Sequence, residues 1–390
     1  MFEAAALVDA AMADTGLGDF GDTTGADFGV GLDRLVTALT TEARLTPLGQ
    51  DILGHRLSTL LRNRLRIEDV YRHHPEIDDE IVAGPLFIIG LPRTGTTALS
   101  QMLSLDPQIR SLRLWESSDP VPPPETATEH TDARIAETEQ GLAAMYETFP
   151  RMVSLHYQTA TGPTECQDLL GMTFRTSHFD GMAYVPSYTA WVTDCDMTGA
   201  YRYHRRVLRL LQWRCPPRLW HLKTPVHMLA LDALDAAYPD ARFLWTHRHP
   251  AEVLGSVCSL VGYTRSWVSD YADPAELGAQ QLALWSESLR RAVAFRGAVG
   301  EDRFADISFS ALNADPLATV DASYRRFGLT LSAEAAARLG DWAAANPRGS
   351  GGSHEYDLSD FALDPATVAD RFAFYTDAFP ALVADAAPGA

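Results

Sequence analysis

A short apolar run that breaks into a glycine-containing turn constrains the fold of this chain most. Residues 85–97 read Pro-Leu-Phe-Ile-Ile-Gly-Leu-Pro-Arg-Thr-Gly-Thr-Thr, and the residues that follow have the apolar spacing of a helix. Backbone N–H groups at the start of a helix lack intrahelical acceptors, and the helix dipole adds partial positive charge there. A strand, a turn and a helix in this order therefore predict a cradle for a phosphate-like anion.

The cradle departs from the common nucleotide-binding loop in one respect. Gly90 and Gly95 are spaced as in a Walker A loop, but that motif continues with Lys and then Ser or Thr. Here Thr96 and Thr97 follow instead. Arg93, inside the loop, supplies the missing positive charge, and its planar guanidinium group suits a tetrahedral anion.

The segment from Pro92 to Thr97 resembles the phosphosulfate loop of the sulfotransferases that use 3′-phosphoadenosine 5′-phosphosulfate (PAPS). A second segment resembles the same family: residues 242–248 read as a buried strand that ends in Arg248, and Ser256 follows on a helix. In that family an arginine and a serine at these places bind the 3′-phosphate of PAPS. The resemblance implies a set of PAPS-binding residues: Arg93, Thr94, Gly95, Thr96, Thr97, Arg248 and Ser256.

A third segment, residues 218–225, reads as a strand that ends in Lys223, and we expect a helix from Val226 to Tyr238 after it. It resembles the Lys-x-Pro turn of tyrosylprotein sulfotransferases, in which the lysine assists the departing phosphate. The order of the three segments is that of the family over roughly residues 85–260, and the pattern is most similar to bacterial and actinobacterial sulfotransferases. The resemblance implies that Lys223 and Arg93 are catalytic, through electrostatic stabilisation of the breaking bond.

Transfer of a sulfuryl group to a hydroxyl is helped by a base, and Glu116 is the predicted base. It ends residues 110–116, which we expect to form a second parallel strand, and open α/β sheets place their chemistry at the carboxyl ends of strands. A glutamate at the corresponding place is the base in tyrosylprotein and heparan-type sulfotransferases. The alternative for Glu116 is a surface ion pair with Arg110 or Arg113.

Other residues compete for a role beside the acceptor. His156 and His178 are alternative bases, because histidine is the base in the cytosolic small-molecule branch of the family. Glu165 is a further carboxylate that could orient the acceptor, although an acid at a helix start can simply complement the helix dipole. His247 and His249 flank Arg248, and we expect their side chains to point away from the ligand.

The predicted fold class is α/β, with a P-loop-type parallel sheet flanked by helices. We expect residues 1–84 to form a helical extension packed on the core, and residues 85–390 to form the sulfotransferase α/β domain. A helical insertion at about 130–215, rich in aromatic residues, is predicted to form a substrate lid, unless these aromatics only pack a core. A segment at about 346–390 is predicted to close over the cofactor, where Arg348 and Gly349 resemble, in altered form, a PAPS-binding loop.

Composition limits the partners of this chain. The 390 residues carry a net charge of −19 at pH 7, which argues against nucleic acid and anionic membrane surfaces. The N-terminus lacks a basic region before its apolar residues, and no apolar run is long enough to span a bilayer. The four cysteines show no metal-binding or disulfide spacing, so we expect reduced thiols, no metal and a cytoplasmic location.

Together these patterns predict an enzyme that moves the sulfuryl group of PAPS to a hydroxyl of a small, apolar acceptor such as a lipid, terpenoid, polyketide or glycolipid. Two alternatives remain open from the sequence. One is a P-loop kinase that phosphorylates a small molecule with ATP and Mg²⁺. The other is a non-catalytic nucleotide-binding protein, because a fold and an anion cradle do not guarantee turnover.

Overall fold

A five-stranded, fully parallel sheet forms the centre of the computed structural model, which describes residues 2–21, 27–215, 219–346 and 357–384. The strand order is β2-β3-β1-β4-β5. The strands are β1 (Leu86–Ile89), β2 (Ile109–Ser111), β3 (Leu219–Lys223), β4 (Arg242–His247) and β5 (Phe304–Ser308). Because β1 lies between β3 and β4, the loops that follow these three strands meet at one edge of the sheet.

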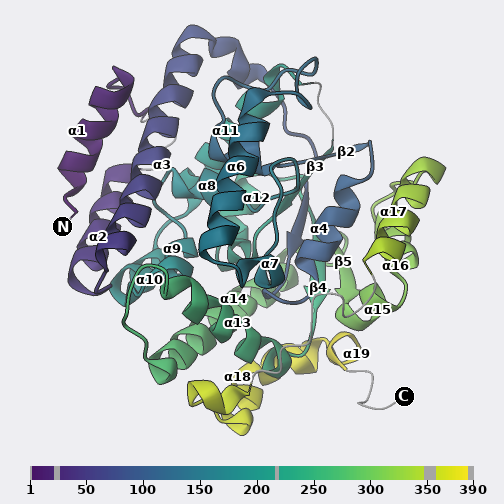
Figure 1. Cartoon of the computed structure of the whole chain (residues 1–390). Coiled ribbons are helices and arrows are strands. Elements are labelled where there is room, and N and C mark those ends of the chain that lie inside the picture. Colours follow the sequence, from purple (N-terminus) through teal and green to yellow (C-terminus); the bar gives the residue numbers. More distant parts are fainter. Residues whose placement is uncertain (1, 22–26, 216–218, 347–356, 385–390) are drawn as a thin grey trace.

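Helices cover both faces of the sheet, which explains why β1 is a continuous apolar run rather than an alternating one. Leu86 and Ile88 point to a cluster with the helices α4, α15, α16 and α17, whereas Phe87 and Ile89 join a larger cluster on the other face. Figure 1 shows α4 and α15–α17 on one side of the sheet and α11 and α12 on the other. The predicted fold class, a parallel sheet flanked by helices, is confirmed.

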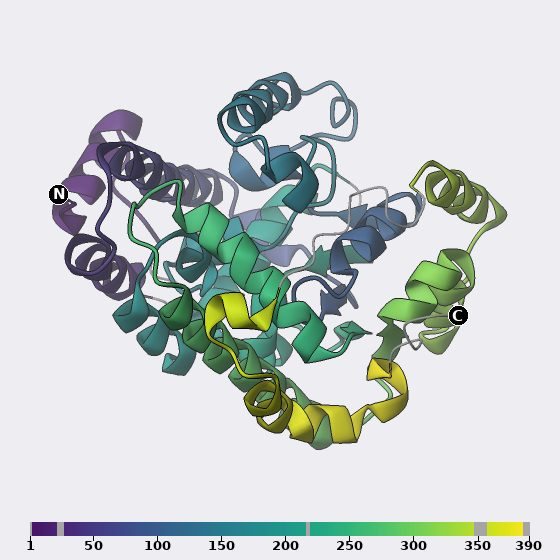
Figure 2. The ribbon, with the colours of Figure 1, turned by 60° about the horizontal axis from the view of Figure 1, so that its bottom comes forward.

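The residues before the first strand form helices, as predicted. They are α1 (Ala4–Thr15), α2 (Phe28–Thr41), α3 (Pro47–His73) and the 3₁₀ helix η1 (Pro75–Asp79). Their leucine stripes are buried, and they belong to the same apolar cluster as one face of the sheet. Figures 1 and 2 both place these helices at the opposite end of the molecule from α15–α17.

Seven helices lie between β2 and β3 in the described part of this segment. They are α5 (Leu114–Ser118), α6 (Ala133–Thr148), α7 (Met152–Leu155), α8 (Gln167–Gly171), α9 (His178–Met182), α10 (Pro186–Asp194) and α11 (Thr198–Trp213). Figure 2 shows α6 at the rim of the molecule. The insertion predicted at about 130–215 is therefore helical, with the long helices α6 and α11 at its two ends and shorter helices in the aromatic region between them.

The strand expected over residues 110–116 is shorter than predicted. It ends at Ser111, and α5 begins three residues later. Glu116 causes the early helix start, because its Oε1 accepts a hydrogen bond from the backbone N–H of Arg113 at 3.1 Å. This arrangement satisfies a donor that would otherwise be unpaired at the start of α5. Glu116 consequently lies in the first turn of a helix and not at a strand end.

The remaining helices follow β3, β4 and β5. They are η2 (Pro225–Leu229), α12 (Leu231–Ala237), α13 (Pro250–Arg265), α14 (Pro274–Val299), α15 (Phe309–Ala314), α16 (Pro316–Arg326), α17 (Ala333–Ala345), η3 (Leu358–Phe361), α18 (Pro365–Ala378) and α19 (Pro380–Val383). The single helix expected from Val226 to Tyr238 is split, because Ala230 has the non-helical angles φ −147° and ψ 50°. None of the helices that the structure describes combines the length and the apolar character needed to cross a membrane.

Candidate functional site

The loop between β1 and α4 (Thr96–Ser104) has the backbone geometry of an anion cradle. Gly90 and Gly95 have φ angles of 139° and 89°, which favour glycine, and Arg93 also adopts a positive φ of 67°. A Cβ atom at Gly90 would lie 2.3 Å from Oγ1 of Thr246, so glycine also allows β4 to approach closely. Gly95 caps α4 without a side-chain hydrogen bond, which leaves the first-turn N–H groups of α4 without side-chain caps.

The threonines of the loop have different environments. Thr94 is 1% exposed, and its hydroxyl bonds to the carbonyl of Leu91 at 2.7 Å and to Oγ1 of Thr246 at 2.6 Å. Its side chain therefore fixes the loop to β4. Thr96 is also buried, whereas Thr97 lines a small cavity described below.

The structure brings Arg93 together with Arg248 and Ser256, which lie more than 150 residues later in the chain. Nε of Arg93 donates to Oγ of Ser256 at 3.2 Å, and Nη1 of Arg248 donates to the backbone carbonyl of Arg93 at 3.3 Å. The guanidinium of Arg248 also lies 4.3 Å from the ring centre of Phe309, the first residue of α15. A serine hydroxyl and two guanidinium groups thus share one place beside the start of α4.

A buried ion pair lies at the end of β3. Nζ of Lys223 is 2.7 Å from Oε1 of Glu165, and the hydroxyl of Thr224 donates to Oε2 of the same carboxylate at 3.2 Å. The side chains of Lys223 and Glu165 are 3% and 14% exposed. Burial acts to raise the pKa of Glu165, but Lys223 and then His156 outweigh it and hold this pKa at about 2.

A cavity of about 40 Å³ connects this pair to the anion cradle. Its lining includes Thr97 of α4 together with His156, Tyr157, Glu165 and Lys223. Burial, with help from the charge of Lys223, lowers the pKa of His156 to about 4, so this imidazole is neutral near pH 7. The cavity therefore combines a cation, a carboxylate and a neutral imidazole beside the start of a helix.

The loop of residues 160–166 carries Glu165 to this place. The backbone N–H of Thr164 donates to the carbonyl of Leu112 at 2.8 Å, and that of Cys166 donates to the carbonyl of Lys223 at 2.9 Å. The loop thus runs along the ends of the β2 and β3 region. Gly162 and Pro163 mark a turn in the sequence, but nothing in the sequence indicates which distant residues this loop contacts.

Glu116 is completely buried. Its Oε2 accepts from Nη2 of Arg110 at 3.0 Å and from Nη2 of Arg113 at 2.9 Å. Burial acts to raise the pKa of Glu116, but these two guanidinium groups outweigh it and hold this pKa below its usual value. Glu116 thus pairs with both arginines named as its alternative partners, inside the protein rather than at its surface.

The other predicted residues have separate places. His178 begins α9, and burial, foremost, lowers its pKa to about 4. His247 bonds to the hydroxyl of Tyr375 at 2.7 Å and to Asp306 at 2.9 Å, and His249 caps α13 through the backbone N–H of Ala251. Both histidines that flank Arg248 are therefore engaged outside the cradle. Arg348 and Gly349 lie outside the described residues.

Comparison with known proteins gives one consistent result. Residues 85–333 match the profile of the sulfotransferase family. The structure is similar to the crystal structure of sulfotransferase STF1 from Mycobacterium tuberculosis, at 34% sequence identity and a TM-score of 0.86, covering 96% of this chain and 99% of that one. It is also similar to sulfotransferase STF9 from Mycobacterium avium, at 30% identity and a TM-score of 0.90, covering 97% of each chain. No curated protein matches significantly.

Proposed function

The chain belongs to the sulfotransferase family, and we propose that it transfers the sulfuryl group of PAPS to a hydroxyl of a small molecule. One observation carries the proposal: Arg93, Arg248 and Ser256, from segments more than 150 residues apart, meet beside the start of α4. PAPS carries two anionic groups, the 5′-phosphosulfate and the 3′-phosphate, and the site offers one group of hydrogen-bond donors for each. Backbone N–H groups of α4, with Arg93, Thr94, Gly95, Thr96 and Thr97, hold the phosphosulfate, whereas Arg248 and Ser256 hold the 3′-phosphate.

Lys223 is proposed to stabilise the negative charge that forms on the leaving phosphate. Its ammonium group lies at the end of β3 in the cavity that Thr97 also lines. The acceptor oxygen forms a bond to sulfur while the bond from sulfur to the bridging phosphate oxygen breaks, and negative charge grows on the departing phosphate. Lys223 and Arg93 stabilise this charge, and 3′-phosphoadenosine 5′-phosphate (PAP) leaves.

The geometry supports Glu165 as the group that takes the hydroxyl proton. Its carboxylate shares the cavity with Lys223, and its pKa is low because Lys223 lies 2.7 Å away. When the ammonium group turns to the phosphate of the donor, this attraction weakens and burial raises the basicity of the carboxylate. Glu116, the base predicted from the sequence, stays a competing proposal that a matched variant tests below.

The acceptor is proposed to be a neutral, largely apolar alcohol or phenol, such as a lipid, terpenoid, polyketide or glycolipid. Two exposed apolar side chains support this choice. Val153 on α7 and Tyr157 in the cavity lining are 50% and 53% exposed, so both side chains are accessible to an acceptor. The helices between β2 and β3 would then act as the lid over this acceptor. A cytoplasmic location is part of the proposal, because all four cysteines are free thiols.

Calorimetry with PAP tests the donor site without any knowledge of the acceptor. We expect PAP to bind without a metal ion, and Arg248→Ala to weaken it by about 10- to 100-fold, because hydrogen bonds to charged groups contribute about 1.5–3 kcal/mol. Arg290→Ala is the matched control, since Arg290 is an exposed helix arginine paired with Glu287. A preference for ATP with a strict Mg²⁺ requirement would contradict the proposal.

A second experiment addresses the acceptor. Hydroxylated metabolites are incubated with the protein and labelled PAPS, and mass spectrometry detects the mass of one added sulfate. We expect sulfated products among apolar alcohols or phenols. Products only from polyanionic saccharides or acidic peptides would overturn the acceptor class but leave the donor site intact.

A further inference from the structure

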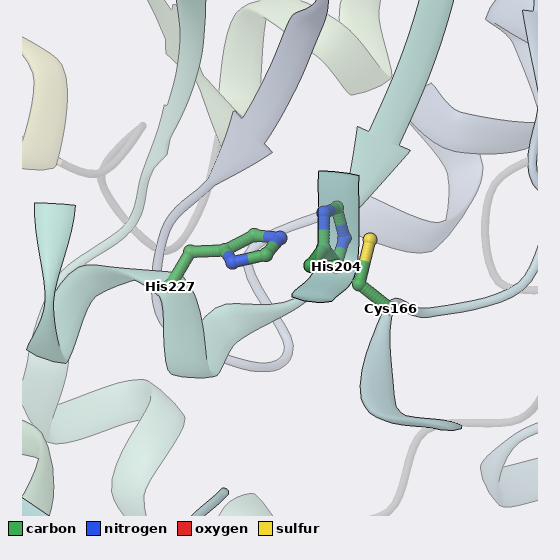
Figure 3. Close-up of side chains that lie close together, drawn as sticks. All are labelled: Cys166, His204 and His227. Atoms are coloured by element: carbon green, nitrogen blue, oxygen red, sulfur yellow. The ribbon is translucent and has the colours of Figure 1, made fainter. Parts of the chain in front are cut away.

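A thiol and two imidazoles meet behind the Lys223–Glu165 pair. Cys166 immediately precedes α8, His204 lies on α11 and His227 lies in η2. The three residues are fully buried, and one potential ligand atom from each lies within 4.8 Å of the other two. Figure 3 shows the side chains converging from three different elements. The proposed sulfuryl transfer makes no use of this cluster.

The hydrogen bonds of the two histidines leave one nitrogen of each without a partner. Nδ1 of His204 bonds to the hydroxyl of Tyr238 at 2.6 Å, and Nδ1 of His227 bonds to the hydroxyl of Tyr201 at 2.8 Å. The Nε2 atoms of both rings are buried and have no hydrogen-bond partner in the described part of the chain. A buried polar atom without a partner costs about 1–3 kcal/mol, so two in one place need an explanation.

The chemistry of the cluster is that of a metal site. The imidazoles of His204 and His227 bond through Nδ1 to tyrosine hydroxyls rather than to carboxylates, an arrangement that suits the neutral form of each ring. A neutral imidazole whose Nδ1–H donates to an oxygen presents the lone pair of Nε2 to a metal ion, and a tyrosine hydroxyl here takes the place of that oxygen. A thiol beside two such nitrogens adds a soft ligand.

We propose that Cys166 Sγ, His204 Nε2 and His227 Nε2 bind one soft, thiophilic metal ion, with Cu(I) the preferred occupant. Charge decides the preference. Binding releases the thiol proton to solvent, so a monovalent ion and one thiolate form a neutral unit, whereas Zn²⁺ would leave a net positive charge in a dry interior. One metal–sulfur bond and two metal–nitrogen bonds form, and no electron is transferred.

The geometry requires a modest adjustment. Metal–sulfur and metal–nitrogen bonds of about 2.3 and 2.0 Å put neighbouring ligand atoms roughly 3.3–3.6 Å apart. The ligand atoms therefore have to close by about 1 Å, which small side-chain rotations supply. A cavity of about 330 Å³ lies nearby: it is lined by Leu170 of α8 and by Val226 and Leu229 of η2, elements that adjoin Cys166 and contain His227.

Competition with a chromogenic Cu(I) chelator under anaerobic, reducing conditions tests the site on the full chain. We expect one Cu(I) per chain, and Cys166→Ser to weaken binding by ~100-fold or more, because the only anionic ligand is lost. Cys258→Ser is the matched control, because Cys258 is a buried thiol on α13 outside the cluster. Equal binding by wild type and Cys166→Ser, or no stoichiometric binding by wild type, would overturn the proposal.

X-ray absorption of the Cu(I)-loaded wild type keeps the test decisive if Cys166→Ser does not fold. The expected spectrum has one sulfur and two imidazole nitrogens around copper, and a spectrum without sulfur would refute the site. The same titration with Zn²⁺ checks the metal preference: tighter stoichiometric Zn²⁺ binding than Cu(I) binding would overturn the choice of ion. These readouts need neither donor nor acceptor, so their failure is distinct from failure of the sulfuryl-transfer proposal.

Discussion

At the scale of single residues, the candidate site depends on two basic side chains, Arg93 and Lys223, that are each held in an uncommon state by a close neighbour. Arg93 holds a left-handed backbone conformation while its guanidinium reaches Ser256. Lys223 is almost completely buried, a rare condition for a lysine, and it is stabilised by the carboxylate of Glu165. Removal of either partner of such a buried pair leaves an uncompensated charge. When the donor separates Lys223 from Glu165, its phosphate is expected to pair with the ammonium group and so to compensate that charge.

The identity of the base is tested by glutamine variants. We expect Glu165→Gln to lower kcat by about 10²- to 10⁴-fold, because a positioned base contributes that much, while PAP affinity changes little. Initial-rate kinetics with an acceptor found by the metabolite screen provide the measurement.

Two further variants complete that test. Glu139→Gln is the control, because Glu139 accepts a hydrogen bond from Ala160 of the same loop without being part of the cavity lining. Glu116→Gln removes the charge between Arg110 and Arg113. If folded Glu116→Gln loses turnover and Glu165→Gln keeps it, the base is Glu116, as the sequence predicted.

At the scale of elements, the helix α18 near the C-terminus supports β4, the strand that Arg248 directly follows. Val368, Phe372 and Tyr375 of α18 face the core. The hydroxyl of Tyr375 bonds to Nδ1 of His247, the residue before Arg248. Packing of α18 thus fixes the end of β4, and with it the backbone from which Arg248 reaches the anion cradle.

Truncation of one buried side chain on α18 measures this support. We expect Phe372→Ala to lower the free energy of unfolding by about 3–5 kcal/mol, because a buried phenylalanine loses both its transfer free energy and its packing. Urea unfolding followed by circular dichroism gives the value. Phe374→Ala, at a half-buried position on the same helix, is expected to cost much less. Equal losses for the two variants would mean that α18 is not held through its buried face.

The sequence was informative about elements that have strong local patterns. The central strand follows from the apolar run of residues 86–89. Arg93 and Arg248 could be assigned to one site because each lies in the loop that follows a strand of the same parallel sheet. The position of Glu165 could not, since it depends on backbone hydrogen bonds to residues far away in the sequence. The strand predicted over residues 110–116 was too long, because Glu116 lies in the first turn of α5 and caps this helix through its own side chain.

At the scale of the whole molecule, the fold buries several histidines in neutral form, and this links its stability to pH. His221 is 1% exposed and bonds to Oγ of Ser111 at 2.8 Å. Burial, followed by the charge of Lys223, lowers its pKa to about 3. Burial also lowers the pKa of His247, against the opposing effect of Asp306. Both side chains therefore stay unprotonated where the unfolded chain takes up protons.

The sign of the effect follows from linkage. Below about pH 6.5, the pKa of histidine in the unfolded chain, the unfolded state binds more protons than the folded state. For each such histidine, the free energy of unfolding therefore falls by about 1.4 kcal/mol for every unit by which the pH is lowered. We expect stability to fall between pH 6.5 and 5 and to be level above pH 7.

Urea midpoints across this pH range provide the measurement. His221→Gln should flatten the slope, and His130→Gln, at an exposed position, should leave it unchanged. An unchanged slope in His221→Gln would show that His221 is not kept neutral by the fold.

The strand order has a consequence for how the protein is made. The loop after β1 is synthesised early, yet the strands on either side of β1 in the sheet, β3 and β4, are synthesised more than 120 residues later. A nascent chain that ends before Arg248 therefore contains the glycine turn but lacks Arg248 and Ser256, the residues that lie beside it in the folded protein. A truncated chain is therefore expected not to bind the donor. During synthesis, the edges of β1 stay unpaired until β3 and β4 are made, and this is the period in which the chain is most prone to aggregate.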